Sequence, residues 1–139
     1  MKPSMMNVSG TEGFGTGLRC PVKQGEVDRI FAGREPLDDV QLWERCFRPR
    51  GVAFDTVVRI RRILCDILEV DLFLIRARDE LVEKLSFLWD LDSLADLKIV
   101  HALAEEFRIT ISDAEAEAMK SLLDMVLLVH AKIGIRPTA

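Results

Sequence analysis

The 139-residue sequence predicts an all-α protein: a four-helix bundle of three main helices and one short helix, preceded by an extra N-terminal helix. In several segments apolar residues recur every three or four positions, which is the spacing of a buried helix face. Ser or Asp stands at the start of these segments and Gly or Pro often follows, as in capped helices. The one β-branched run, "RITIS" at 108–112, is long enough only for an extended link. With 49% hydrophobic residues, the chain can bury one small core.

The N-terminal part is predicted to hold a tail and one helix. Residues 1–37 are expected to be a disordered tail and linker, because five of the eight glycines fall within the first 25 residues and hydrophobic periodicity is weak there. The extra helix is predicted over 38–50, where apolar residues recur at helical spacing. Either Asp38 or Asp39 can cap it.

The bundle itself is predicted over 54–134, followed by a flexible C-terminus at 135–139. Its helices are expected at about 55–69, 93–107, 113–120 and 122–133. The segment 70–92 is rich in apolar residues, so we expect a loop lying on the core. Within that loop a helical turn is predicted near 79–85, capped by Asp79.

Composition narrows the class of protein. Net charge is −4, and residues 79–130 contain 12 Asp/Glu against four Lys/Arg. Such a surface repels phosphates and attracts basic proteins, so nucleic-acid binding is not expected. No apolar run approaches the roughly 18 residues of a membrane helix, so membrane insertion is not expected. Three cysteines without metal-ligand spacing favour a reducing cytoplasm, where we expect a monomer.

One serine stands out at the predicted start of a helix, in Asp92-Ser93-Leu94. Taken alone, this triplet is a weak motif, and the serine can simply be a helix N-cap. The nearest histidine in sequence, His101, follows eight residues later, which is about 12 Å of helical rise. No general base is therefore expected beside Ser93, and we predict neither catalytic residues nor a metal site.

The residues that follow this serine form a longer pattern. In order they are Asp92-Ser93-Leu94, Leu97-x-Ile99-Val100, Glu105-Glu106-Phe107, Ile109-x-Ile111, the acidic stretch 113–117, and Ser121 with Asp124. This order and spacing resembles the acyl carrier protein family, over roughly 54–133. The resemblance implies the four-helix fold of that family and a carrier that is not an enzyme.

By this resemblance, Ser93 would carry 4′-phosphopantetheine, transferred from coenzyme A by a phosphopantetheinyl transferase. The arm would hold acyl intermediates as thioesters between enzymes of fatty acid, lipid or polyketide-type biosynthesis. Partners would include acyl-loading, synthase and acyltransferase enzymes with basic docking grooves. The docking residues so implied are Asp92, Leu94, Asp96, Glu105 and Glu106. The candidates for an acyl cleft, which can equally be core residues, are Leu97, Val100, Leu103, Phe107 and Met125.

The sequence also departs from the family's pattern. Ala95, Lys98 and Ala104 make the helix after Ser93 less acidic than is usual in the family. His101 replaces an apolar residue, and Trp89 replaces a small or acidic residue. These departures, together with the N-terminal extension, indicate a divergent, specialised carrier with a dedicated partner. They leave one alternative open. The chain would then be an unmodified adaptor of the same fold, binding a partner through its acidic helix or its extension.

Overall fold

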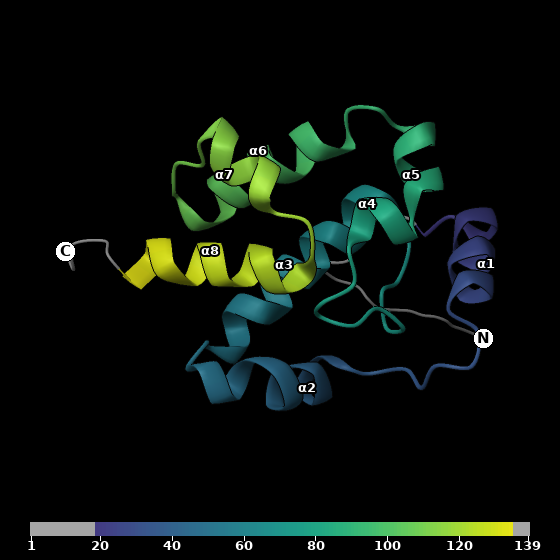
Figure 1. Cartoon of the computed structure of the whole chain (residues 1–139), viewed down its shortest axis with the longest axis horizontal. Helices are drawn as coiled ribbons and strands as arrows, with labels where there is room; N and C mark the ends of the chain where they lie inside the picture. The colour runs from purple at the N-terminus through teal and green to yellow at the C-terminus, as the bar shows by residue number, and fades with distance from the viewer. Residues whose placement is uncertain (1–18, 135–139) are drawn as a thin grey trace, which may run out of the picture.

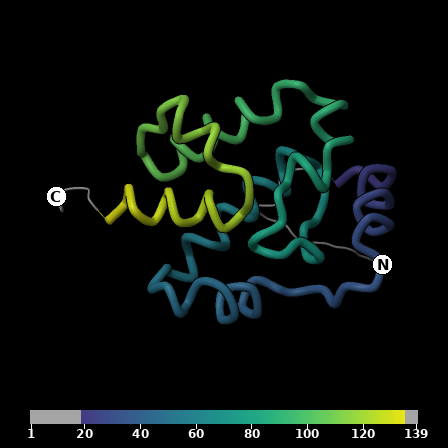
Figure 2. The backbone as a smooth tube through the Cα atoms, in the orientation of Figure 1, coloured from purple at the N-terminus to yellow at the C-terminus, as the bar shows by residue number. Residues whose placement is uncertain are grey.

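The computed structural model describes residues 19–134, and within this range the chain is helical without strands, which confirms the all-α prediction. The residues at 1–18 and 135–139, expected to be flexible, lie outside the described part. The elements are α1 (Pro21–Ile30), α2 (Asp39–Leu42), the π-helical turn η1 (Trp43–Phe47), the 3-10 turn η2 (Arg48–Arg50), α3 (Phe54–Leu68), α4 (Leu81–Lys84), α5 (Ser86–Leu91), α6 (Ala95–Phe107), α7 (Asp113–Ala118) and α8 (Leu122–Gly134). Helix α1 and the end of α8 lie at opposite ends of the long axis (Figure 1), as the backbone trace also shows (Figure 2).

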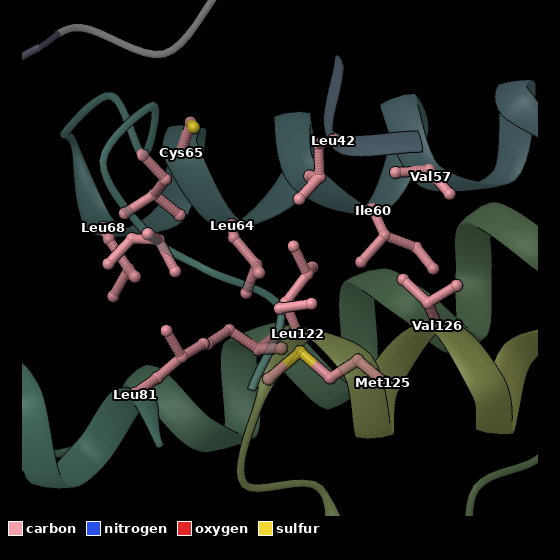
Figure 3. Packing of buried hydrophobic residues seen from close by; sticks show 14 of the residues in the cluster. Leu42, Val57, Ile60, Leu64, Cys65, Leu68, Leu81, Leu122, Met125 and Val126 are labelled. Atoms are coloured by element: carbon pink, nitrogen blue, oxygen red, sulfur yellow. The ribbon is translucent and has the colours of Figure 1, made fainter. Parts of the chain in front are cut away.

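Helix α3 is the centre of the bundle and packs against α6, α8 and the α2–η1 segment. Its buried positions recur at helical spacing, as predicted, and include Val57, Ile60, Leu64 and Leu68. Figure 3 shows this face of α3 opposite the first turns of α8. Both α6 and α8 pack against α3, so α3 fixes the positions of these two helices relative to each other.

The prediction of a disordered tail and linker over 1–37 is wrong at 21–30, where the structure has helix α1. Helix α1 begins with Pro21 in its first turn, where the fixed φ of proline favours a helix and its missing N–H costs nothing. Its apolar residues are few, but Val27 and the following Phe31 are buried in the core. The Cys20 N–H also donates to the Glu69 carbonyl at 2.8 Å. Contacts with the end of α3 therefore order a segment whose own composition indicates disorder.

The extra helix predicted over 38–50 is present as a chain of three turns, α2, η1 and η2. Asp38 rather than Asp39 caps it, because its carboxylate accepts from the Gln41 N–H at 2.8 Å while the Gln41 side chain accepts from the Asp38 N–H. The helix ends at Gly51, whose φ of +77° lies in the left-handed region that favours glycine. Trp43 ties this end back by donating to the Val52 carbonyl at 2.7 Å.

Between α3 and α6 the structure has two short helices instead of one turn in a loop. Helix α4 matches the turn expected near 79–85, but Asp79 does not cap it. The Asp79 carboxylate instead accepts from the Arg76 N–H at 2.8 Å and from the Arg34 guanidinium at 2.6 Å. Helix α5 was not predicted. Its formation depends on burial of Leu88 against the core rather than on a cap, since no side chain caps it.

One buried charge joins the extension to the bundle. Arg61 of α3 is only 3% exposed, and its guanidinium donates to the carbonyls of Leu37 at 2.8 Å and Leu72 at 2.9 Å. It also pairs with Asp39 at 3.0 Å and lies over the Phe73 ring. A buried guanidinium is stable only where its N–H groups have hydrogen-bond acceptors. The hydrogen bonds to Arg61 therefore fix the positions of the linker at Leu37 and of the loop at Leu72 relative to α3.

Two further features bear on the class of protein. Within residues 19–134, no helix is both long enough and apolar enough to cross a membrane. The three cysteines are free thiols, and burial raises the pKa of the Cys65 thiol to about 11. Cys65 is therefore protonated at neutral pH and a poor nucleophile.

We predict that Arg61→Ala destabilises the protein by about 2–4 kcal/mol, because it leaves the buried carbonyls of Leu37 and Leu72 without a donor. Urea denaturation of the full chain measures this free energy of unfolding. The matched variant Asp39→Asn should cost less than about 1 kcal/mol, because the Asp39 side chain is 40% exposed. Equal costs for the two variants would contradict this role of Arg61.

Candidate functional site

Ser93 lies in the turn between α5 and α6 and is exposed. The prediction that α6 starts at Ser93 is wrong by two residues, because the first helical residue is Ala95 and the N-cap position is Leu94. No side chain caps α6, so the structure does not support an N-cap role for Ser93. The Ser93 hydroxyl therefore lies on the short turn between α5 and α6 and makes no capping hydrogen bond to α6.

The carboxylate of Asp92 shapes this turn. One oxygen accepts from the Leu94 N–H at 3.0 Å, and the other accepts from the Lys98 ammonium at 2.6 Å. The Lys98 ammonium, followed by the Leu94 N–H, lowers the pKa of Asp92 below its ordinary value. Asp92 is therefore charged at neutral pH and bridges the turn to the second turn of α6.

A second contact crosses the same turn. The Trp89 indole N–H of α5 donates to the Asp96 carboxylate in the first turn of α6 at 2.6 Å. Trp89 and Asp96 lie on either side of Ser93 in the sequence, so this bond limits how far the two helix ends can separate. The turn is held from both sides while Ser93 stays exposed.

Neither histidine of the described residues lines the hollow at Ser93. His101 follows about two turns along α6, where it is exposed and lies 3.6 Å from Glu105. Across residues 19–134, no group of three or more His, Cys, Asp or Glu side chains is arranged to hold a metal ion. The carboxylates of Asp92 and Asp96 near Ser93 are bound by Lys98 and Trp89, and those of Asp113 and Glu117 line the same hollow as Ser93. No histidine is among the residues that line this hollow.

Ser93 also lines a cleft of about 400 Å³ between α6, α7 and the start of α8. The lining residues are Ser93, Asp96, Leu97, Ile99, Val100, Asp113, Ala116, Glu117, Met119 and Met125. The carboxylates of Asp96, Asp113 and Glu117 belong to the lining, while the remaining residues are mostly apolar. The cleft can therefore hold an apolar chain that starts near Ser93.

The structure divides the predicted cleft residues into two groups. Leu97, Val100 and Met125 line the cleft, whereas Leu103 and Phe107 are buried core residues away from it. The buried stripe of α6 is Ala95, Ile99, Leu103 and Phe107. Leu97, which we expected to line the cleft or the core, is 66% exposed, and Leu94 is 56% exposed. Neither leucine belongs to the buried stripe.

Sequence reasoning missed several lining residues, notably Ile99, Ala116 and Met119. Ile99 carried a readable signal, because it lies one turn after Ala95 and one turn before Leu103 on a single face. No sequence signal pointed to Ala116 or Met119, since only the position of α7 beside α6 places them in the cleft.

The predicted acidic docking residues are all engaged within the chain. Asp92 and Asp96 bind Lys98 and Trp89 as described. Glu106 accepts from the Arg59 guanidinium at 2.7 Å, and Glu105 lies near His101. The negative charge of this face is therefore partly compensated.

Apolar side chains stand out instead around the serine. Leu91, Leu94 and Leu97 are each more than half exposed and surround the Ser93 turn in sequence. Exposed leucines gathered next to a candidate reactive group are typical of a protein-contact surface. The surface beside Ser93 is thus more apolar than the sequence pattern suggested.

A helical bundle that presents an exposed serine beside an apolar cleft, without a base or a metal site among its described residues, has the features of a carrier domain. Comparisons with known proteins extend this conclusion. An acyl carrier protein of Phenylobacterium zucineum (strain HLK1) is 34% identical over 82 residues, which is 58% of this chain and 96% of that protein. Acyl carrier proteins of Thermosynechococcus vestitus and Helicobacter hepaticus are 34% and 32% identical, over 55% of this chain in each case and 89% and 96% of their own length.

The chain belongs to the acyl carrier protein family. Members of this family are carriers and not enzymes, so the chain is a carrier as well. No family model matches the sequence, and no solved structure matches it.

Proposed function

We propose that Ser93 is the attachment residue for 4′-phosphopantetheine and that the protein shuttles acyl intermediates between biosynthetic enzymes. The observation that carries this proposal is the position of Ser93, which is exposed on a turn and lines an apolar cleft. When bound, the group supplies a thiol on a flexible arm, on which acyl groups are held as thioesters. Membership of the acyl carrier protein family supports this assignment.

The residues around Ser93 fit such a group. A phosphodiester on the serine oxygen would stand before the N-terminus of the 13-residue helix α6, where free N–H groups favour negative charge. Lys98 holds the neighbouring carboxylate of Asp92, which reduces repulsion between that carboxylate and a phosphate. Because no histidine lies beside Ser93, the hydroxyl needs a phosphopantetheinyl transferase to activate it.

The cleft is proposed to receive the acyl chain. Leu97, Val100 and Met125 would contact it, together with Ala116 and Met119 on the opposite wall. Such burial removes apolar surface from water at roughly 25 cal/mol per Å². Leu103 and Phe107 support the wall from the core and would not contact the chain.

The docking face is proposed to be Leu94 with Asp92 and Asp96, flanked by Leu91. The exposed leucines would provide apolar contact with a partner's surface, and the carboxylates would steer its basic groove. Glu105 and Glu106 lie at the far end of α6, so we assign them a weaker steering role. Partners of this face would be the transferase and then the acyl-loading, synthase and acyltransferase enzymes of fatty acid, lipid or polyketide-type biosynthesis.

We predict that incubation with coenzyme A and a broad-specificity transferase adds the mass of one phosphopantetheine group to the full chain. Intact-mass spectrometry measures the addition. Ser93→Ala should abolish it, because no other serine stands on the turn before α6. Ser86→Ala, at another exposed serine at the start of α5, should leave it unchanged.

Absence of any mass gain with several transferases would overturn the attachment proposal. The same variants separate the carrier from the adaptor in the native cell. If Ser93→Ala retained full cellular function, the chain would act as an unmodified adaptor of the carrier fold.

The cleft proposal predicts that loading the arm with a long acyl chain raises the melting temperature of the protein. Ala116→Phe should remove most of this rise, because the ring fills the space between α6 and α7. Ala118→Phe is the matched control, since Ala118 is exposed on α7 and does not line the cleft. Thermal unfolding of loaded and unloaded protein measures the difference. The same rise in both variants would show that the chain lies elsewhere.

The docking proposal predicts that Lys98→Glu increases the rate of Ser93 modification several-fold at low salt. The change frees Asp92 from its partner and adds a second negative charge next to it, which speeds encounter with a basic groove. The gain should shrink as salt is added. Lys84→Glu on α4 makes the same change in net charge away from the Ser93 turn and should have no such effect. Equal rates for both variants would contradict steering at this face.

A further inference from the structure

A second hollow of about 400 Å³ lies where the extra helix meets the bundle, away from Ser93. We call it the arginine groove, and its lining residues are Arg45, Cys46, Pro49, Arg50, Arg76, Ala77, Arg78 and Leu123. Leu123 lies in this groove while Met125 lines the cleft. Residues two apart on a helix are about 200° apart around its axis, so the two hollows open on different sides of α8. The groove is therefore a separate site.

The groove gathers positive charge that the chain does not neutralise. Arg45, Arg50 and Arg78 are exposed, and within residues 19–134 none of them makes an ion pair with a carboxylate. Other arginines of the chain behave differently, as the pairs formed by Arg34 and Arg59 with Asp and Glu residues show. The chain as a whole carries a net charge of −4, so the groove is a local exception.

Arg76 is held in place without being neutralised. Its guanidinium donates to the Glu35 carbonyl at 2.7 Å and to the Leu74 carbonyl at 3.4 Å, and its backbone N–H donates to Asp79. Carbonyl acceptors orient the guanidinium but leave its full charge. A cation fixed in this way loses little conformational entropy when an anion binds.

Four guanidiniums around one hollow repel one another, and an anion between them would relieve that repulsion. Guanidiniums bind phosphate and carboxylate groups through paired N–H donors. A terminal phosphate has about two negative charges and three acceptor oxygens, so it can contact more than one of these arginines at a time. Apolar side chains of Pro49, Ala77 and Leu123 complete the wall. A volume of this size falls within the roughly 300–1,000 Å³ of small-molecule sites.

We propose that the arginine groove binds an organic phosphate, a small molecule with at least two negative charges and an apolar part that contacts Pro49, Ala77 and Leu123. This inference does not depend on modification of Ser93. The groove takes half of its arginines from the extra helix and half from the loop before α4, so it exists only where the extension is docked on the bundle. The extra helix thereby gives this carrier a second binding site, separate from Ser93. A soluble phosphate compound bound there would regulate the carrier or direct it to a partner.

The test is isothermal titration calorimetry of the full chain with ADP, pyrophosphate and adenosine as probes. ADP and pyrophosphate should each saturate one site, and adenosine should not bind. Arg45→Gln combined with Arg50→Gln should weaken ADP binding by at least about tenfold, since two charge-assisted contacts are lost. The control combines Arg29→Gln and Arg48→Gln, which remove the same charge from exposed arginines paired with Glu26 and Glu44 outside the groove. This control should bind ADP as the unchanged protein does.

Several results would overturn the proposal. They are no saturable binding of ADP or pyrophosphate, equal binding of adenosine and ADP, or equal weakening in both double variants. Cosedimentation with anionic phospholipid vesicles distinguishes a headgroup as the source of phosphate. Binding to vesicles, or to a Glu-rich peptide, without any response to ADP would refute a small-molecule site.

Discussion

The buried guanidinium of Arg61 is the interaction on which the architecture of this carrier depends. Its terminal N–H groups donate to acceptors on the linker at Leu37, on the loop at Leu72 and on Asp39. The extra helix is therefore held against α3 by the cost of leaving a buried charge unsatisfied. Through this contact the extension becomes part of the bundle, and the arginine groove forms at the junction.

A related constraint operates at the Ser93 turn on a smaller scale. Lys98 and Trp89 each bind a carboxylate across the turn, so α5 and α6 are joined on both sides of an exposed serine. Lys98 also compensates the charge of Asp92, while the neutral indole of Trp89 occupies an oxygen of Asp96 without changing its charge. Residues that departed from the family's pattern in the sequence thus have a physical role, since they stabilise the turn and make its surroundings less negative and more apolar.

Much of this arrangement could be predicted from the sequence, but only where local signals were strong. The core face of α3 followed from its helical spacing, and the short helix α7 lies within the predicted segment 113–120. Helix α1 could not be found in this way, because its order comes from contacts with the end of α3. Leu97 and not Ile99 was among the predicted cleft or core residues, yet Ile99 is the buried one, since both are apolar and periodicity alone cannot choose between them.

By itself the sequence determined the class of this protein: an all-α bundle with a serine before its second main helix and a pattern typical of acyl carrier proteins. These properties follow from residue type and spacing along one helix at a time. The tertiary structure alone decided which residues line the cleft with Ser93, which carboxylates are already paired, and which arginines converge at the extension. Such features depend on distances between residues far apart in the chain, which only the packing of the helices sets.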